Sequence, residues 1–70
     1  MDGTFDLERM GRQFAEARTA KNLSGAELSY MLGRSRGYMK DVEKGRANIS
    51  IKAFYELCHV LELDPKEFFD

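Results

Sequence analysis

Apolar residues recur at intervals of three and four along most of this chain, which is the spacing of an α-helix that buries one face. The first such run consists of Leu7, Met10, Phe14 and Ala17. It predicts a helix that begins near Asp6 and ends between Ala20 and Asn22. Nowhere does the chain alternate apolar and polar residues as a half-buried strand does. The pattern therefore predicts an all-α fold.

The next amphipathic run opens with a pair of residues that is typical of a helix start. Ser24 and Glu27 have the spacing of a capping box, in which the hydroxyl accepts from an early helical N–H and the carboxylate accepts from the N–H of the serine itself. The helix that begins there is expected to bury Leu28 and Leu32. The small Ser29 suits the close approach of another helix.

A third helix is predicted directly after a glycine turn. Gly33 is placed to adopt the left-handed conformation that ends the preceding helix, and Ser35 is expected to cap the third helix. Its core contacts would be Met39 and Val42, and Gly45 would stop it. Two short helices joined by a turn that contains glycine form a helix-turn-helix, whose second helix can lie in the major groove of DNA.

The rest of the chain predicts one further full helix and a final turn. Residues 46–49 are expected to form a loop, and Ser50 is expected to cap a fourth helix. The apolar stripe of that helix consists of Ile51, Phe54, Leu57, Cys58 and Leu61. A fifth short helix is expected to start with a cap, a first-turn proline and a capping-box partner, which are Asp64, Pro65 and Glu67. Residues 1–70 are thus predicted to form a single domain of five short helices, in which residues 1–5 are left free to be disordered.

The composition excludes most kinds of active site. The 70 residues include one cysteine and one histidine, so they can form neither an internal disulfide nor a four-ligand zinc site. Cys58 is expected to be a small core residue rather than a metal ligand or a nucleophile. No nucleophile stands beside a plausible base, and the chain has too little volume for a buried pocket. We therefore expect no enzyme, no cofactor and no small-molecule substrate.

The chain shows no sign of export or membrane insertion. It has no long uncharged stretch, signal peptide or lipidation motif, so we expect a cytoplasmic protein with no membrane partner. A core of this size supplies only about 3 to 5 kcal/mol of stability. Association into an oligomer would add to that stability.

Charge is distributed unevenly along the chain. The net charge is −1, whereas a nucleic-acid-binding domain is usually basic. However, residues 34–52 contain six basic and two acidic residues, and residues 53–70 contain five acidic residues and one basic residue. These charges could simply solvate the surface. Because the basic cluster coincides with the second helix of the predicted motif, a phosphate-binding surface is favoured.

Taken in order, several short motifs resemble the Cro and lambda-repressor type of helix-turn-helix protein, also called the XRE family. The resemblance runs from about Met10 to Phe69. It rests on Leu-Ser-x-x-Glu-Leu-Ser, Gly33, Ser35, Val42-Glu43-Lys-Gly45, Ser50 and the closing Leu-x-Leu-Asp-x-x-Glu-Phe-Phe. It implies a five-helix lambda-repressor-like DNA-binding domain with the helix-turn-helix at helices 2 and 3. It also implies a small bacterial or phage transcriptional regulator, more often a repressor, that binds a palindromic operator as a homodimer.

The resemblance also implies roles for individual residues. Arg18 and Glu43 match a charged pair that ties the first helix to the end of the recognition helix. The positions that face base edges match Ser35, Arg36, Gly37 and Asp41, to which we add Lys40. The positions that approach phosphates match Ser24, Lys44, Gly45 and Arg46, to which we add Arg34 and Asn48. The expected dimer surface consists of large apolar residues near the end of the chain, which are Leu61, Leu63, Phe68 and Phe69.

Elementary chemistry supports the DNA-contacting roles independently. Arg36, expected in the first turn of the recognition helix, can make a bidentate contact to guanine O6 and N7 that is worth about 1 to 3 kcal/mol of discrimination. Lys40 is one turn further on and can reach a base edge or a backbone oxygen. Lys44 and Arg46 flank Gly45, where backbone N–H groups and two cations could hold one stretch of phosphates and set the register.

Three departures from the family pattern leave a second function open. Gly25 stands where the family usually has a glutamine, and Gly37 has no side chain at a base-reading position. Asp41 could accept from cytosine N4 but would repel a phosphate. Gly37 could instead allow a close approach of the backbone to DNA or to Tyr30 and Tyr38. The alternative function is a protein-interaction or antitoxin-like module with little DNA affinity of its own.

Overall fold

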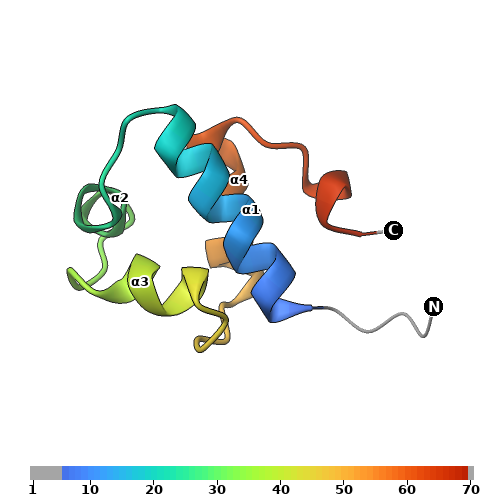
Figure 1. Ribbon diagram of the computed structural model, residues 1–70, viewed down its shortest axis with the longest axis horizontal. Helices are drawn as coiled ribbons and strands as arrows, with labels where there is room; N and C mark the ends of the chain where they lie inside the picture. Colours follow the sequence, from blue (N-terminus) through green and yellow to red (C-terminus); the bar gives the residue numbers. More distant parts are fainter. Residues whose placement is uncertain (1–5, 70) are drawn as a thin grey trace.

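The computed structural model describes residues 6–69 as a small bundle of helices (Figure 1). Its elements are α1 (Leu7–Ala20), α2 (Gly25–Met31), α3 (Tyr38–Glu43), α4 (Ile51–Leu61) and a 3-10 helix, η1 (Pro65–Phe68). Within residues 6–69 there is no strand, so the predicted all-α class is confirmed. The fifth predicted helix is a single 3-10 turn rather than an α-helix. The expectation of disorder for residues 1–5 lies outside the described residues.

Side-chain caps explain where three of the helices begin. The Asp6 carboxylate accepts from two N–H groups in the first turn of α1. Ser24 and Glu27 form a complete capping box at the start of α2. Ser50 Oγ accepts from a first-turn N–H of α4. Because each cap satisfies donors that have no partner within the helix, these three helix starts lie where the sequence predicts them.

Gly33 and Gly45 end α2 and α3, as predicted. Their φ angles are +71° and +74°, in the left-handed region that glycine adopts without the steric penalty of a Cβ. After α3, the N–H of Gly45 donates to Val42 O and the N–H of Arg46 donates to Asp41 O. These two bonds form a Schellman motif, which satisfies carbonyl groups at the end of the helix.

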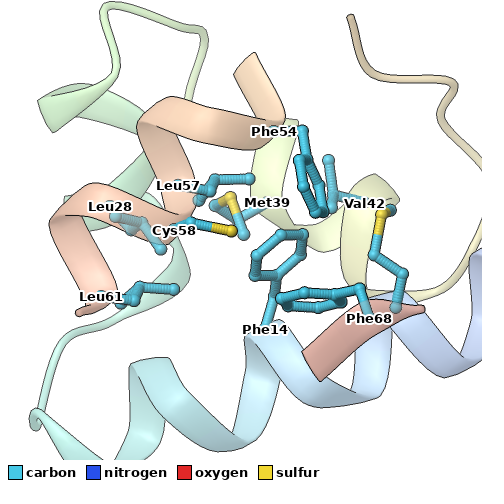
Figure 2. Close-up of a cluster of buried hydrophobic side chains, with 10 residues drawn as sticks. Phe14, Leu28, Met39, Val42, Phe54, Leu57, Cys58, Leu61 and Phe68 are labelled. Atoms are coloured by element: carbon cyan, nitrogen blue, oxygen red, sulfur yellow. The ribbon is translucent and has the colours of Figure 1, made fainter. Parts of the chain in front are cut away.

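One hydrophobic core joins the helices. In Figure 1, α1 crosses the middle of the molecule, with α2 and α3 to one side and η1 to the other. Phe14 is fully buried, and its ring centroid lies 4.9 Å from that of Phe68 and 6.0 Å from that of Phe54 (Figure 2). The other buried members are Met10, Leu28, Met39, Val42, Leu57, Cys58 and Leu61. Because Phe68 comes from η1, the last turn closes the core.

Ile51 belongs to the predicted stripe of α4 but does not join the core. It is 77% exposed, whereas Phe54, the next member of the stripe, is 8% exposed. Ile51 is the first residue of α4, and the core ends one turn later, at Phe54. The buried stripe is therefore one turn shorter than predicted, and a large apolar side chain stays on the surface of α4.

Candidate nucleic-acid interface

Three cations spaced four residues apart lie along α3 and the turn before it. Arg36, Lys40 and Lys44 are exposed, and none forms an ion pair within residues 6–69. Together with Gly25 and Ala26, from the start of α2, they line a groove of about 500 Å³. We call these three residues the cation strip. Their charges are open to a ligand along one side of the predicted helix-turn-helix.

Arg18 and Glu43 line the same groove and form the predicted charged pair. Arg18 Nε lies 2.7 Å from Glu43 Oε2 and Nη2 lies 3.1 Å from Oε1, so the contact is bidentate. Arg18 Nη1 also donates to Leu23 O at 2.7 Å. The hydrogen bond to Glu43 raises the pKa of Arg18 above its ordinary value. The pair joins α1, the loop before α2 and the end of α3, and it neutralises an acidic side chain that lines the same groove as the cation strip.

A buried serine holds the start of α3 against α2. Ser29 is fully buried; its hydroxyl donates to Gly25 O at 2.8 Å and accepts from Met39 N–H at 2.9 Å. Met39 is in the first turn of α3, and Gly37 at the N-cap provides no side-chain bond. Ser29 therefore acts as a cap supplied by the neighbouring helix. From the sequence, Ser29 was predicted only to be a small residue at a helix contact.

The predicted cap of α3 at Ser35 is wrong. α3 begins at Tyr38, after a turn, and Ser35 contributes its backbone carbonyl, which accepts from Tyr38 N–H at 3.0 Å. Arg36 therefore lies in the turn before α3 and not in its first helical turn. The physical reason is that Ser29 already satisfies the first-turn donor that a local cap would serve.

Glycine positions bring the end of α3 into direct contact with α1. A Cβ at Gly11 would lie 2.5 Å from Glu43 O and 2.6 Å from Val42 O. At Gly45, whose φ is positive, a Cβ would lie 2.9 Å from Glu8 Cγ and 3.2 Å from the Glu8 backbone. The role of Gly11 was not predicted from the sequence. A glycine in the interior of a helix, where it is unfavourable by about 1 kcal/mol, was the available signal.

The five residues expected to face bases lie together at the exposed end of the motif. Ser35, Arg36 and Gly37 occupy the turn before α3, and Lys40 and Asp41 follow on the helix itself. All five are exposed. The structure thus brings these five exposed residues onto one segment of seven residues, 35–41.

Two of the expected phosphate contacts already have partners within the chain. Arg46 Nη2 lies 3.1 Å from Asp41 Oδ1, in a pair whose side chains are 57% and 55% exposed. The backbone N–H groups of Gly45 and Arg46 are used in the Schellman motif. The prediction that these N–H groups hold a phosphate is therefore wrong. Gly45 is needed for the turn and for its contact with Glu8, and an exposed pair such as that of Arg46 is weak enough to open.

The other expected phosphate residues are exposed around the motif. Ser24, Arg34, Lys44 and Asn48 all have exposed side chains. The guanidinium of Arg34 lies 5.1 Å from the centroid of the Tyr38 ring, which is within the range of a cation–π contact. Tyr38 therefore restrains Arg34 next to the start of α3.

Burial changes the expected dimer surface. Leu61 and Phe68 are 3% and 6% exposed and pack inside the chain, so the prediction that they form a dimer surface is wrong. Leu63 is half-buried against the core. Phe69 is 59% exposed. The physical reason is that η1 folds back and uses Phe68 to close the core over Phe14.

The structure narrows the explanations for two glycines. A Cβ at Gly37 would meet no atom within 4 Å, which excludes a close approach to Tyr30 as the reason for this glycine. A Cβ at Gly25 would lie 3.8 Å from Met39 Cβ, an ordinary contact. Both positions therefore have room for a side chain within the fold.

Cys58 is buried, and its pKa is raised, first by burial and then by the charges of Asp64 and Glu67. A buried thiol with a raised pKa is unreactive. Among residues 6–69, no three histidine, cysteine or acidic side chains gather as they would around a metal ion. No helix in the same range is long and apolar enough to cross a membrane.

The sequence is similar to a helix-turn-helix family model and to two proteins whose names refer to control or regulation. Residues 9–68 match the model of the helix-turn-helix domain family. The chain is 32% identical over 59 residues to the ImmF control region 10 kDa protein of Bacillus phage phi105, and the match covers 84% of this chain and 66% of the phage protein. It is also 32% identical over 63 residues to the uncharacterized HTH-type transcriptional regulator y4dJ of Sinorhizobium fredii, covering 89% of this chain and 82% of that protein.

Two solved structures have a similar fold. The restriction-modification controller protein C.AhdI from Aeromonas hydrophila aligns with a TM-score of 0.79 at 38% identity, over 91% of this chain and 93% of that chain. The clp gene regulator ClgR from C. glutamicum aligns with a TM-score of 0.79 at 25% identity, over 93% of this chain and 84% of that chain. The likeness therefore extends over nearly the whole chain in both sequence and structure.

Proposed function

This chain belongs to the helix-turn-helix family of the Cro and lambda-repressor type, and from that premise we propose that it represses transcription by binding a palindromic operator as a homodimer. In each half-site, α3 and the turn before it would enter the major groove. The observation that carries the proposal is the cation strip, in which Arg36, Lys40 and Lys44 are exposed and unpaired within residues 6–69. Phosphates and guanine edges are the natural partners of such cations.

In this proposal, the residues in the turn before α3 and on α3 read bases, and the residues around them bind phosphates. Arg36, in the turn before α3, reads a guanine through O6 and N7. Ser35 and Gly37 accompany it at the same end. Lys40 reaches an adjacent base edge or phosphate, and Asp41 accepts from cytosine N4. Asp41 can use Oδ2 for this bond while Oδ1 holds Arg46. Opening of this exposed pair would free that arginine for the DNA backbone.

The proposed phosphate contacts surround the base-reading residues. Lys44 lies at the end of α3, and Arg34 and Asn48 lie before and after the helix. Ser24 Oγ accepts from Glu27 N–H and can still donate its own hydrogen to a phosphate. Such contacts fix the register of the protein on DNA without reading the sequence.

The names of the similar proteins support a role in gene control. They describe a phage control region protein, a transcriptional regulator, a restriction-modification controller and a regulator of clp genes. Occupancy of an operator within a promoter is by itself sufficient to block transcription. Repression is therefore the form of control that we propose for this chain.

The test begins with selection of binding sites from random duplex DNA by the full chain. The selected duplex is then titrated at two salt concentrations, with binding followed by fluorescence anisotropy. Arg36→Ala is expected to lose about 1 to 3 kcal/mol of discrimination at one base pair, while Lys44→Ala weakens all sequences equally and reduces the salt slope by about 1. Lys66→Ala, an exposed lysine in η1, serves as the control and is expected to leave binding unchanged.

One observation favours the alternative of an interaction module with little DNA affinity. Asp41 lies on α3 among the base-facing residues, and its carboxylate neutralises Arg46. That alternative predicts no binding of any duplex at either salt concentration. Retention of full sequence preference by Arg36→Ala would contradict the assigned reading role.

A further inference from the structure

The outer face of α4 carries an exposed apolar side chain and, further along the helix, a groove. The side chain does not fill the groove of its own chain. Ile51, at the start of α4, is 77% exposed. Further along the helix, Lys52, Tyr55, Glu56 and His59 line a groove of about 440 Å³, to which the end of α2 also contributes. Their spacing of i, i+3, i+4 and i+7 is that of the four residues that receive a knob in helix packing.

We propose that this face of α4 binds the same face of a second copy of the chain, so that the partner's Ile51 fills the groove. The inference rests on the proposed function, because it names the surface of the homodimer. A knob and a hole on one helix satisfy each other when a two-fold axis places two copies of that helix antiparallel. Each copy then gives one isoleucine and receives one.

The charges on α4 fit the same two-fold axis. In an antiparallel pair, Ile51 meets the partner's residues 55 and 56 when the axis passes near position 53 of the helix. Lys52 then lies opposite the partner's Glu56, with an offset along the helix axis of no more than one or two residues. Each residue of offset corresponds to a rise of about 1.5 Å. Neither Lys52 nor Glu56 has an ion pair within the described part of the chain. A second copy would supply an ion-pair partner to Lys52 and to Glu56 at the same time.

Exposed aromatic rings add to this surface. Tyr55 is 55% exposed, and its ring packs against Phe54 with the centroids 5.6 Å apart. Phe69 is 59% exposed and packs against the same Phe54 ring at 6.0 Å. Both rings therefore rest on a core residue that fixes their position. Such held aromatic groups are typical of the buried centre of interfaces.

The test uses charge reversal and measures association by sedimentation equilibrium without DNA. The unaltered chain is expected to dimerise. Lys52→Glu places two acids opposite each other across the axis, and Glu56→Lys places two bases opposite each other. Each variant alone is expected to raise the dimer dissociation constant by about tenfold or more, because like charges replace opposite charges twice.

An equimolar mixture of the two variants provides the decisive measurement. In a mixed dimer, each reversed charge meets an opposite charge, so native mass spectrometry should detect the mixed dimer at close to the affinity of the unaltered chain. Recovery in the mixture also shows that both variants are folded. Ile51→Ser should weaken the dimer as well. The matched control Tyr30→Ser, which removes a side chain 84% exposed on α2, should have no effect.

Three results would overturn the inference: a monomeric unaltered chain, single variants that dimerise as well as the unaltered chain, or a mixture that stays monomeric. Titration of the selected operator with each variant separates this inference from the proposed function. Dimerisation that follows the charge-reversal pattern without any DNA binding would sink only the proposed function. Operator binding by a chain that dimerises through another surface would sink only the inference about α4.

Discussion

A single glycine inside α1 decides how closely α3 can approach it. At Gly11, an added Cβ would lie 2.5 Å from Glu43 O and 2.8 Å from Glu43 C. These are backbone atoms at the end of α3, which cannot move aside as a flexible side chain can. Gly11→Ala is therefore expected to lower the free energy of unfolding by about 1 to 3 kcal/mol. Urea unfolding followed by circular dichroism would show this as a lower midpoint with an unchanged slope.

Gly37 provides the matched control for that experiment. Its φ of −88° and ψ of 3° are open to any residue, and a Cβ there would meet nothing within 4 Å. Gly37→Ala should therefore raise the free energy of unfolding by about 0.4 to 1 kcal/mol, since alanine restricts the unfolded chain. Equal stability of the two alanine variants would show that α1 and α3 are not in backbone contact. A loss of DNA affinity by Gly37→Ala would show that DNA approaches the backbone here.

A hydroxyl group on α2 is expected to be as important for stability as a core side chain. Ser29→Ala would leave the buried Met39 N–H without its acceptor, which should lower the free energy of unfolding by about 1 to 3 kcal/mol. Ser35→Ala is the comparison, because that exposed side chain caps no helix. Thermal unfolding of both variants measures the difference. An equal loss from the two substitutions would restore Ser35 as the cap of α3.

At the scale of helices, local signals predicted most boundaries and failed at α3. The caps at Asp6, Ser24 and Ser50 act within three residues of themselves, so their patterns are visible in the sequence. α3 has six residues and no side-chain cap of its own. An isolated helix of that length is unstable, so its start depends on contacts from α1 and α2. Ser29 is ten residues from its partner, and no local pattern reveals such a bond.

In the candidate site, too, the features set by local sequence were predicted and those set by contacts between distant residues were not. The cation strip repeats every four residues, and the pattern of charge alone placed it on one segment. The burial of Leu61 and Phe68 depends on η1 folding back over Phe14, and apolar residues at the end of a chain are equally compatible with a core or a dimer surface. For the same reason, Ile51 was predicted to join the core, although the structure leaves it on the surface.

The capping box of α2 makes the stability of the chain depend on pH. The pKa of Glu27 is lowered, chiefly because its carboxylate accepts from the backbone N–H of Ser24. A carboxyl group whose pKa is lower in the folded state stabilises the fold above its ordinary pKa of about 4.5, and this contribution is lost as pH falls through the lowered value. The urea midpoint of the natural chain should therefore fall between about pH 5 and about pH 3.

Glu27→Gln isolates this contribution. Glutamine can accept the same bond without titrating, so the midpoint of the variant should fall less over the same range. The pKa of Glu62 is also lowered, first by its hydrogen bond with Lys21, so part of the dependence should remain until Glu62→Gln is added. Identical pH profiles for the natural chain and the double variant would contradict both assignments.

At the scale of the whole molecule, two consecutive segments of the chain differ in charge. Residues 34–52 carry a balance of basic charge and residues 53–70 a balance of acidic charge. A net charge of −1 therefore does not oppose DNA binding, because the cation strip lies within the basic segment and five acidic residues lie beyond it. Such a charge distribution orients the protein during encounter with a polyanion.

The dimer proposed through α4 makes the spacing of operator half-sites a property of the protein. Two α3 helices related by one two-fold axis can enter successive major grooves on one face of DNA only when the half-site centres are about one turn apart, which is about 10 to 10.5 base pairs. Insertion of about five base pairs rotates one half-site by half a turn, to the opposite face. We expect this insertion to reduce the affinity of the natural chain to that of a single half-site.

The variant Lys52→Glu, whose dimer is expected to be weaker by about tenfold or more, gives the internal comparison for that experiment. It lacks the coupling between half-sites, so its weaker binding should be the same for the natural and the lengthened operator. Gel mobility shift of both duplexes with both proteins measures the four affinities. If the natural chain bound the two duplexes equally well, each α3 would act alone, and the operator would be read by independent monomers. If the insertion weakened both proteins to the same degree, the spacer itself would be contacted, and the assignment of half-sites would have to change.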